Sequence, residues 1–169
     1  MNRALGEEQL AALADVDALL SLHGIDYWLF GGWAVDVYVG SVTRDHDDVD
    51  IAVWLSDHER IAGLLLADGW QHAPEEDEDG GTGYERGVVR LELTYLVRDE
   101  EGGAVYTPLR DGLAAWSDDA FGEDVAELSG VRARVIGRAA LERGKSRSRD
   151  DPAEAAKDRA DFDRLSSGP

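Results

Sequence analysis

The chain has 169 residues, 43% of them hydrophobic, and its 36 Asp and Glu residues outnumber 17 Lys and Arg residues, which gives a net charge of -19. This length and apolar content, with five Trp, indicate one compact domain or a core with a small appendage, and they exclude a disordered acidic tail. The charge repels nucleic acid and anionic membranes and attracts cations, although solubility explains most of the surface acids. The lack of cysteine excludes disulfides and thiolate metal sites.

The N-terminal segment 1–10 lacks the basic-then-apolar layout of a signal peptide, and no apolar run approaches the length of a membrane span. We therefore expect a cytoplasmic enzyme with neither a membrane nor a nucleic acid as its partner.

Helices and strands alternate in the first half of the chain. Apolar residues at helical spacing predict a covering helix over residues 7–23, with Gly24 as its cap. Similar signals predict a strand over 25–30, a helix over 33–39, a strand over 49–54, and a helix that Ser56 caps with Glu59 at the capping-box position and that ends at Gly69.

A glycine pair, Gly31 and Gly32, ends the first apolar strand and leads into a helix. A glycine turn at a helix N-terminus presents backbone N–H groups and a positive dipole end, so a triphosphate can bind there. Arg44, in the spacer after this helix, has a fork of donors that could clamp the triphosphate, with a surface salt bridge as the alternative. The pattern alone is a weak signal of a phosphate cradle.

Two carboxylates at alternate positions make the signal stronger. In the strand over 49–54, Val49, Ile51 and Val53 share the core face, while Asp48 and Asp50 project together from the other face. Neighbouring carboxylates repel each other unless they share a cation or a proton, and Mg²⁺ prefers oxygen ligands and substrate phosphates. The alternative is a solvated strand edge.

A second acidic strand lies downstream. The segment 84–97 predicts one or two strands with a break near Gly87, in which Leu91, Leu93 and Tyr95 alternate with polar residues. If this strand pairs with the strand over 49–54, Glu92 reaches the two aspartates. An exposed strand glutamate is the alternative.

Three residues near these motifs have simpler interpretations. Trp33 is expected to pack in the core, and Asp36 to be helical and structural. His46 could orient Asp48 or contact a substrate, but a loop histidine usually does neither.

The acidic run from Glu75 to Asp79, followed by two glycines, predicts a solvated loop. It is either a simple hairpin tip or a segment that attracts a cationic substrate.

The second half of the chain has weaker signals. After residue 103 the composition becomes loop-like, and we divide the chain into a core over 1–103 and a region over 104–169 that completes the substrate cleft. In that region we expect a hairpin formed by 125–128 and 131–136 with Arg132 and Arg134 on its outer face, a polar linker over 144–150, and a helix that begins at Asp151 and continues to Leu165.

These motifs together resemble the signature of small antibiotic nucleotidyltransferases of the DNA polymerase β superfold, and are most similar to aminoglycoside 2''-O-nucleotidyltransferases and lincosamide nucleotidyltransferases. The resemblance is strong over residues 27 to 53 and weak to about residue 97. It is carried by the residues Gly31-Gly32-Trp33-Ala34-Val35-Asp36, Gly40, Thr43, Arg44, His46-Asp47-Asp48 and Asp50-Ile51.

The resemblance implies a polymerase β-like α+β core, a mixed sheet with covering helices on one face. It also implies that Glu92 supplies a third carboxylate, as metal ligand, as base on the acceptor hydroxyl, or as both, where the relatives usually have Asp. Lys157, in a helix similar to the C-terminal helix of these transferases, could reach the nucleotide phosphates. A surface pair with Asp161 is the favoured alternative.

The function expected from the resemblance is transfer of AMP from ATP to a hydroxyl of an aminoglycoside. Asp48, Asp50 and Glu92 would hold two Mg²⁺ ions, and Gly31 and Gly32 would hold the phosphates. Three alternatives stay open: a lincosamide or another small acceptor, modification of a partner protein in a toxin–antitoxin pair, and a nucleotide- or drug-binding module without catalysis. The toxin–antitoxin class is disfavoured because its members usually have Gly-Ser and a shorter spacer.

Overall fold

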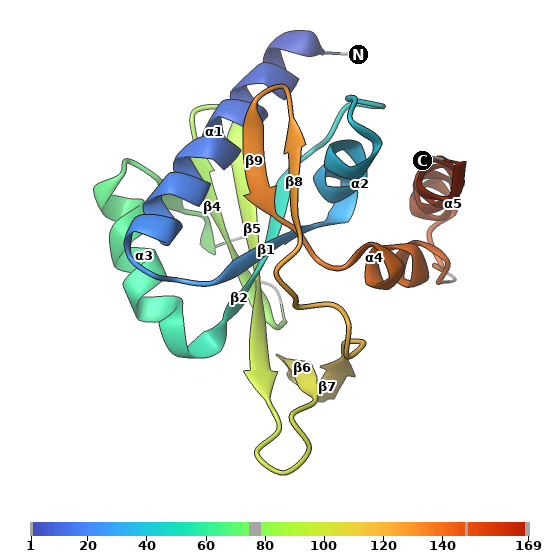
Figure 1. The fold of residues 1–169 in the computed structure, drawn as a ribbon. Helices are drawn as coiled ribbons and strands as arrows, with labels where there is room; N and C mark the ends of the chain where they lie inside the picture. Colours follow the sequence, from blue (N-terminus) through green and yellow to red (C-terminus); the bar gives the residue numbers. More distant parts are fainter. Residues whose placement is uncertain (1, 75–78, 148, 168–169) are drawn as a thin grey trace.

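The computed structural model describes residues 2–74, 79–147 and 149–167 (Figure 1). Its centre is a mixed sheet with the strand order β1-β2-β5-β4-β3. Strand β2 runs antiparallel to β1 and parallel to β5, and β4 is antiparallel to β5. The bounds of these strands are β1 (Tyr27–Phe30), β2 (Val49–Trp54), β3 (Gln71–His72), β4 (Gly81–Arg86) and β5 (Val89–Arg98).

The hydrophobic core forms because the strands alternate as their sequence predicts. Leu29, Ile51 and Val53 have no exposed surface, and Leu91 and Leu93 are also buried. The helices that enclose this core are α1 (Arg3–Leu22), α2 (Gly31–Val39), α3 (His58–Ala67), α4 (Arg138–Lys145) and α5 (Pro152–Ser167). The predicted α+β class, with a mixed sheet and covering helices, is confirmed.

The helices lie on both faces of the sheet, so the expectation of helices on one face is wrong. Helix α1 packs against β5 and β9, whereas α2 packs against β1 and β2 from the other side and is itself covered by α4 and α5 (Figure 1). The acidic face of β2 therefore lies beside the N-terminus of α2, and Asp48 and Asp50 are partly buried.

The last part of the chain packs into the same core as the first. Strand β6 (Val105–Leu109) continues the sheet from β5 and pairs with β7 (Gly112–Ala115), while β8 (Val125–Leu128) and β9 (Val131–Arg134) form the predicted hairpin. Val135 bridges to Leu29 of β1 and is fully buried. The predicted boundary near Ala104 thus falls inside a continuous hydrophobic core.

Several local predictions were wrong. A short 3₁₀ turn, Leu55–Asp57, precedes α3, and neither it nor α3 has a side-chain cap, so Ser56 does not cap the helix. Strands β6 and β7 were expected as loop, and α4 ends inside the segment expected as linker. The start of α5 is as predicted, since Asp151 Oδ1 accepts hydrogen bonds from the backbone N–H groups of Ala153 and Glu154.

Two other sequence observations remain. Residues Glu75 to Glu78, which make up most of the predicted acidic loop, lie outside the described residues. Among the residues that are described, no helix has both the length and the apolar character needed to cross a bilayer.

Candidate functional site

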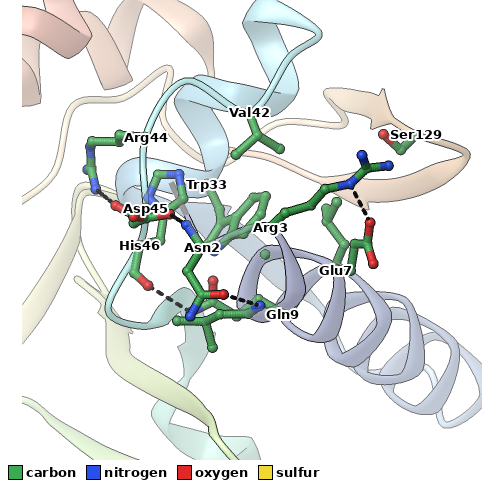
Figure 2. A pocket seen from close by; sticks show the side chains of 13 residues that line it. Asn2, Arg3, Glu7, Gln9, Trp33, Val42, Arg44, Asp45, His46 and Ser129 are labelled. Carbon is green, nitrogen blue, oxygen red and sulfur yellow. Dashed lines mark hydrogen bonds and ion pairs between the residues drawn. The ribbon is translucent and has the colours of Figure 1, made fainter.

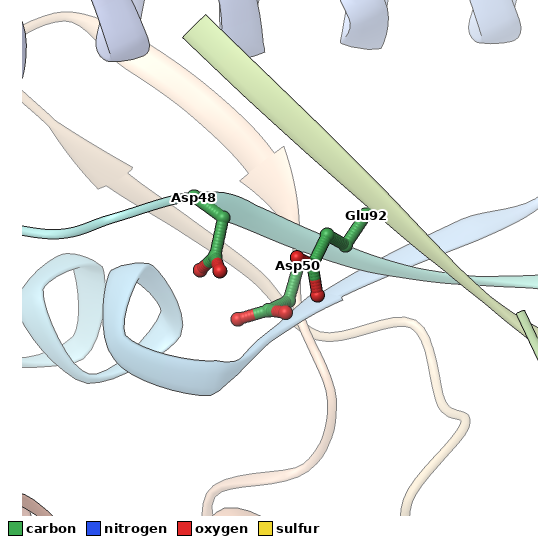
Figure 3. Close-up of side chains that lie close together, drawn as sticks. All are labelled: Asp48, Asp50 and Glu92. Carbon is green, nitrogen blue, oxygen red and sulfur yellow. The ribbon is translucent and has the colours of Figure 1, made fainter. Parts of the chain in front are cut away.

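Three carboxylates meet on the face of the sheet that α2 covers. Strands β2 and β5 pair in parallel with Asp50 directly opposite Glu92, and Asp48 lies two residues earlier on the same face. One carboxylate oxygen from each of the three lies within 4.8 Å of the others (Figure 3). The predicted pairing of the two strands is confirmed, and it brings Glu92 to the two aspartates.

The electrostatics of this cluster explain what it can bind. Burial raises the pKa of Asp50 well above its ordinary value, and the charges of Asp48 and Glu92 raise it further. Burial and then the charge of Asp47 raise the pKa of Asp48. Carboxylates that lie this close together either hold protons or bind a cation, and oxygen ligands suit a hard divalent ion. The residues therefore fit Mg²⁺.

The glycine pair lets the backbone of α2 approach the cluster. Gly31 has φ +69°, and a Cβ atom there would lie 2.0 Å from Asp50 Oδ2, so a side chain is excluded by the carboxylate as well as by the backbone conformation. At Gly32 a Cβ atom would lie 2.5 Å from Arg44 Nη2 and 2.5 Å from His46 Nδ1. The N-terminus of α2 is thus bounded by an acid on one side and by Arg44 on the other.

A buried hydrogen-bond network holds the spacer between α2 and β2. His46 Nε2 donates to Asp36 Oδ2 at 2.6 Å, and Thr43 Oγ1 donates to Asp36 Oδ1 at 2.5 Å. Gln9 Nε2, from α1, donates to the backbone carbonyl of His46 at 3.0 Å. Asp36 is helical and structural, as predicted, but His46 is a buried partner of Asp36 and no ordinary loop histidine. Its role was missed because nothing in the sequence shows that it faces Asp36.

Trp33 packs in the core, as predicted, and has 1% of its surface exposed. It borders a cavity of about 290 Å³ between the first turns of α1, the spacer and Ser129 at the tip of the β8–β9 hairpin (Figure 2). None of the three carboxylates lines this cavity. A smaller cavity, about 60 Å³, does reach Glu92 and is also lined by Asp79, Thr82 and Thr107.

Arg44 is partly buried and pairs with α5. Its Nη2 lies 3.2 Å from Asp161 Oδ2, and Lys145 Nζ lies 3.0 Å from the same oxygen. Arg44 therefore forms an ion pair beside the glycine turn instead of on the open surface. Lys145 was missed because the segment 144–150 was expected as a polar linker, whereas Lys145 belongs to α4.

Lys157 does not pair with Asp161, so the predicted surface pair is wrong. Lys157 Nζ lies 2.9 Å from Glu154 Oε1 and 3.4 Å from Asp47 Oδ2, while Asp161 is buried and pairs with Arg44, Lys145 and Arg164 instead. These two acids raise the pKa of Lys157, the hydrogen bond to Glu154 most of all. The contact with Asp47 places Lys157 next to the segment that carries Asp48.

Comparison with known proteins was consistent with this geometry. The family model described as aminoglycoside-2''-adenylyltransferase matches residues 12–165. A 2''-aminoglycoside nucleotidyltransferase from Klebsiella pneumoniae is 37% identical over 43 residues, which cover 25% of this chain and 24% of that protein. The match to this curated relative thus spans about a quarter of its length.

Two solved structures share the fold over nearly the whole chain. The crystal structure of ANT(2'')-Ia in complex with adenylyl-2''-tobramycin has a TM-score of 0.73 and 18% identity, and the match covers 94% of this chain and 87% of that one. The lincomycin-bound lincosamide antibiotic adenylyltransferase LnuA has a TM-score of 0.71 and 21% identity, with 95% and 96% covered.

The first prediction from this geometry concerns Gly31. Gly31→Ala should lower the free energy of unfolding by more than Gly24→Ala, measured by urea denaturation. Both glycines have positive φ, so both variants carry a strain of about 1–2 kcal/mol. Only Gly31 has a neighbour that a Cβ would meet, because nothing lies within 4 Å of a Cβ at Gly24. Equal losses in the two variants would contradict the close approach of Asp50.

The second prediction concerns the charge on Asp50. Because the folded protein raises the pKa of Asp50, the ionised group destabilises the metal-free fold, and this cost is present above the folded pKa and absent below the unfolded value of about 3.9. Asp50→Asn should therefore raise the Tm in EDTA at pH 7 to 8. The gain should vanish as the pH falls towards 4.

Asp163→Asn is the matched control, since Asp163 is exposed on α5 and should leave the Tm unchanged across this pH range. A Tm of Asp50→Asn that is lower than that of the parent at pH 8 would show that the three carboxylates do not repel one another as the structure implies.

Proposed function

Because the chain belongs to the aminoglycoside-2''-adenylyltransferase family, we propose that it transfers a nucleoside monophosphate, AMP from ATP, to a hydroxyl group of an aminoglycoside. The observation that carries the proposal is the pairing of Asp50 with Glu92 across β2 and β5, beside the glycine turn that begins α2. Nucleotidyl transfer needs such a pairing of a metal site with a phosphate cradle. A cytoplasmic location, where ATP is abundant, is part of the proposal.

In the proposed reaction each part of the site has one task. The backbone N–H groups at Gly31 and Gly32 bind the β- and γ-phosphates, helped by the positive end of α2 and by the guanidinium of Arg44. Asp48, Asp50 and Glu92 would hold two Mg²⁺ ions, which would neutralise phosphate charge. Lys157, beside Asp47, is a candidate for the outer phosphates.

Glu92 is the proposed general base. Its carboxylate takes the proton from the acceptor hydroxyl while the hydroxyl oxygen attacks the α-phosphorus, and the bond from the α-phosphorus to the bridging oxygen breaks, which releases pyrophosphate. Glu92 also lies 3.5 Å from Arg90 Nη2, two residues away on the same strand. Arg90 thus supplies a positive charge beside the proposed base.

The acceptor is proposed to bind at the small cavity that reaches Glu92. The small cavity at Glu92 is bordered by Asp79 and by the hydroxyl-bearing residues Thr82, Thr94 and Thr107, the last of which belongs to β6. The region over 104–169 would thus complete the substrate cleft. An acidic and hydroxyl-rich border suits an acceptor that carries ammonium and hydroxyl groups.

A lincosamide is the second candidate acceptor, favoured by the similarity to LnuA over 96% of that chain. An aminoglycoside is preferred because it carries several ammonium groups, and the net charge of -19 attracts a polycation more strongly than a single amine. A partner protein as acceptor, or binding without catalysis, would also be compatible with a nucleotide site.

The third prediction tests this proposal through pyrophosphate release. With ATP and Mg²⁺, release should require one drug class in a panel of aminoglycosides and lincosamides. Asp50→Asn should abolish release, and Glu92→Gln should lower it about 10²- to 10⁴-fold, as expected for loss of a general base. Asp163→Asn is the control that should keep the parent rate.

Two outcomes would contradict the proposal. Near-normal release in Asp50→Asn would exclude the metal site, whatever the acceptor. If no drug stimulates release although ATP binds, the acceptor is neither class of antibiotic, and a partner protein or a binding module becomes the better explanation.

A further inference from the structure

A second charged cluster lies behind the glycine turn, and its centre is Asp161 of α5. The side chain of Asp161 is 1% exposed, yet three cations contact it. Arg44 Nη2 and Lys145 Nζ share Oδ2 at 3.2 Å and 3.0 Å, and Arg164 Nη1 lies 3.3 Å from Oδ1. Despite burial, which raises the pKa of Asp161, the hydrogen bonds from Arg44 and Lys145 hold it below its ordinary value, so this carboxylate is ionised.

Lys145 is the most enclosed of these cations. Its side chain is 9% exposed, and Nζ also lies 3.0 Å from Asp158 Oδ1, one turn before Asp161 on α5. Asp158 is itself buried and pairs with Arg149 as well. A buried ammonium group is expensive unless it is paired, so the two acids of α5 are what allow Lys145 to be charged at this position.

The two clusters face each other across the N-terminus of α2. The space that a side chain would take at Gly31 is occupied by Asp50, and the space at the next residue, Gly32, is occupied by Arg44. The charges of Lys145 and Arg44 also reach Asp50, since both lower its pKa. Three carboxylates whose oxygens lie within 4.8 Å of one another would attract any cation that is free to move, and a lysine or arginine bound there would exclude a metal ion.

We propose that Asp161 is a positioning residue that holds Arg44 and Lys145 beside the glycine turn, where both face the nucleotide phosphates, and keeps them off the carboxylates of Asp48, Asp50 and Glu92. This inference rests on the proposed function and adds Lys145 to the residues that bind the triphosphate. The acid on α5 separates two sets of charges that would otherwise neutralise each other. The three carboxylates stay available for the metal, and Arg44 and Lys145 stay available for the phosphates.

Packing alone does not require an acid at position 161 of α5. An apolar residue at position 161 would fill the same space, and replacement of buried ion pairs by apolar residues often leaves stability unchanged or improved. Asp161 instead provides two oxygens that orient two cations from different parts of the chain, the spacer before β2 and helix α4. Fixed donors of this kind bind phosphate without losing much side-chain entropy.

The fourth prediction tests the separation of charges by metal binding without nucleotide. Mn²⁺ is titrated calorimetrically into the full chain, and Asp161→Asn should weaken its binding about tenfold, because Lys145 and Arg44 then move towards the three carboxylates. Asp163→Asn, on the same helix but exposed, should bind Mn²⁺ as the parent does. Circular dichroism and Tm establish that the variants are folded.

Two further variants separate positioning from a loss of structure. In the double variant Asp161→Asn/Lys145→Met, Mn²⁺ affinity should recover most of the tenfold loss, since the competing ammonium is gone. Lys145→Met alone should bind Mn²⁺ at least as tightly as the parent but should bind a non-hydrolysable ATP analogue about tenfold more weakly. A merely structural role of Asp161 predicts no recovery in the double variant.

Three results would overturn the inference: unchanged Mn²⁺ affinity in Asp161→Asn, no recovery in the double variant, or weaker Mn²⁺ binding in Lys145→Met. The Mn²⁺ affinity of Lys145→Met tests the inference even if Asp161→Asn fails to fold. These measurements do not depend on turnover, so a chain that releases no pyrophosphate with any drug would contradict the proposed function and leave the result for Asp161 standing.

Discussion

Repulsion among three carboxylates is the constraint on which the rest of the structure depends. The parallel pairing of β2 with β5 sets Asp50 opposite Glu92, and a backbone hydrogen-bond ladder leaves these side chains no way to separate. The N-terminus of α2 reduces this repulsion, because Gly31 allows the positive end of the helix dipole to approach Asp50. Positive charge from Arg44 and Lys145, which lie behind that N-terminus, reduces the repulsion further.

The second half of the chain supplies part of that compensation. Helices α4 and α5 pack against α2 and bring Lys145 and Asp161 behind the glycine turn, while Asp36 and His46 fix the spacer that carries Arg44. The buried acids of this region, Asp36, Asp158 and Asp161, each pair with a neighbouring side chain at hydrogen-bond distance. The C-terminal helices therefore act as an electrostatic support for a site whose acids all come from the first 92 residues.

Sequence patterns could predict the acids because strand alternation determines which face a residue occupies. Asp48 and Asp50 alternate with the apolar residues of β2, Glu92 alternates with the leucines of β5, and the three acids meet once β2 and β5 pair. Lys145 and Asp161 could not be found in this way, since their contact joins two helices whose relative position the sequence does not encode locally. Helix α4 also has no side-chain cap and begins after Gly137, and β6 contains Pro108, a residue type that is uncommon inside strands.

The positions of the charges also suggest how the two substrates of the proposed reaction are kept apart. In-line transfer requires the attacking oxygen and the leaving pyrophosphate to lie on opposite sides of the α-phosphorus. The cations Arg44 and Lys145 lie towards α2 and α5, whereas the cavity that reaches Glu92 opens between β4, β5 and β6. Phosphates drawn to the cations and an acceptor held at Glu92 would therefore approach the metal site from different directions, which is the geometry that the displacement needs.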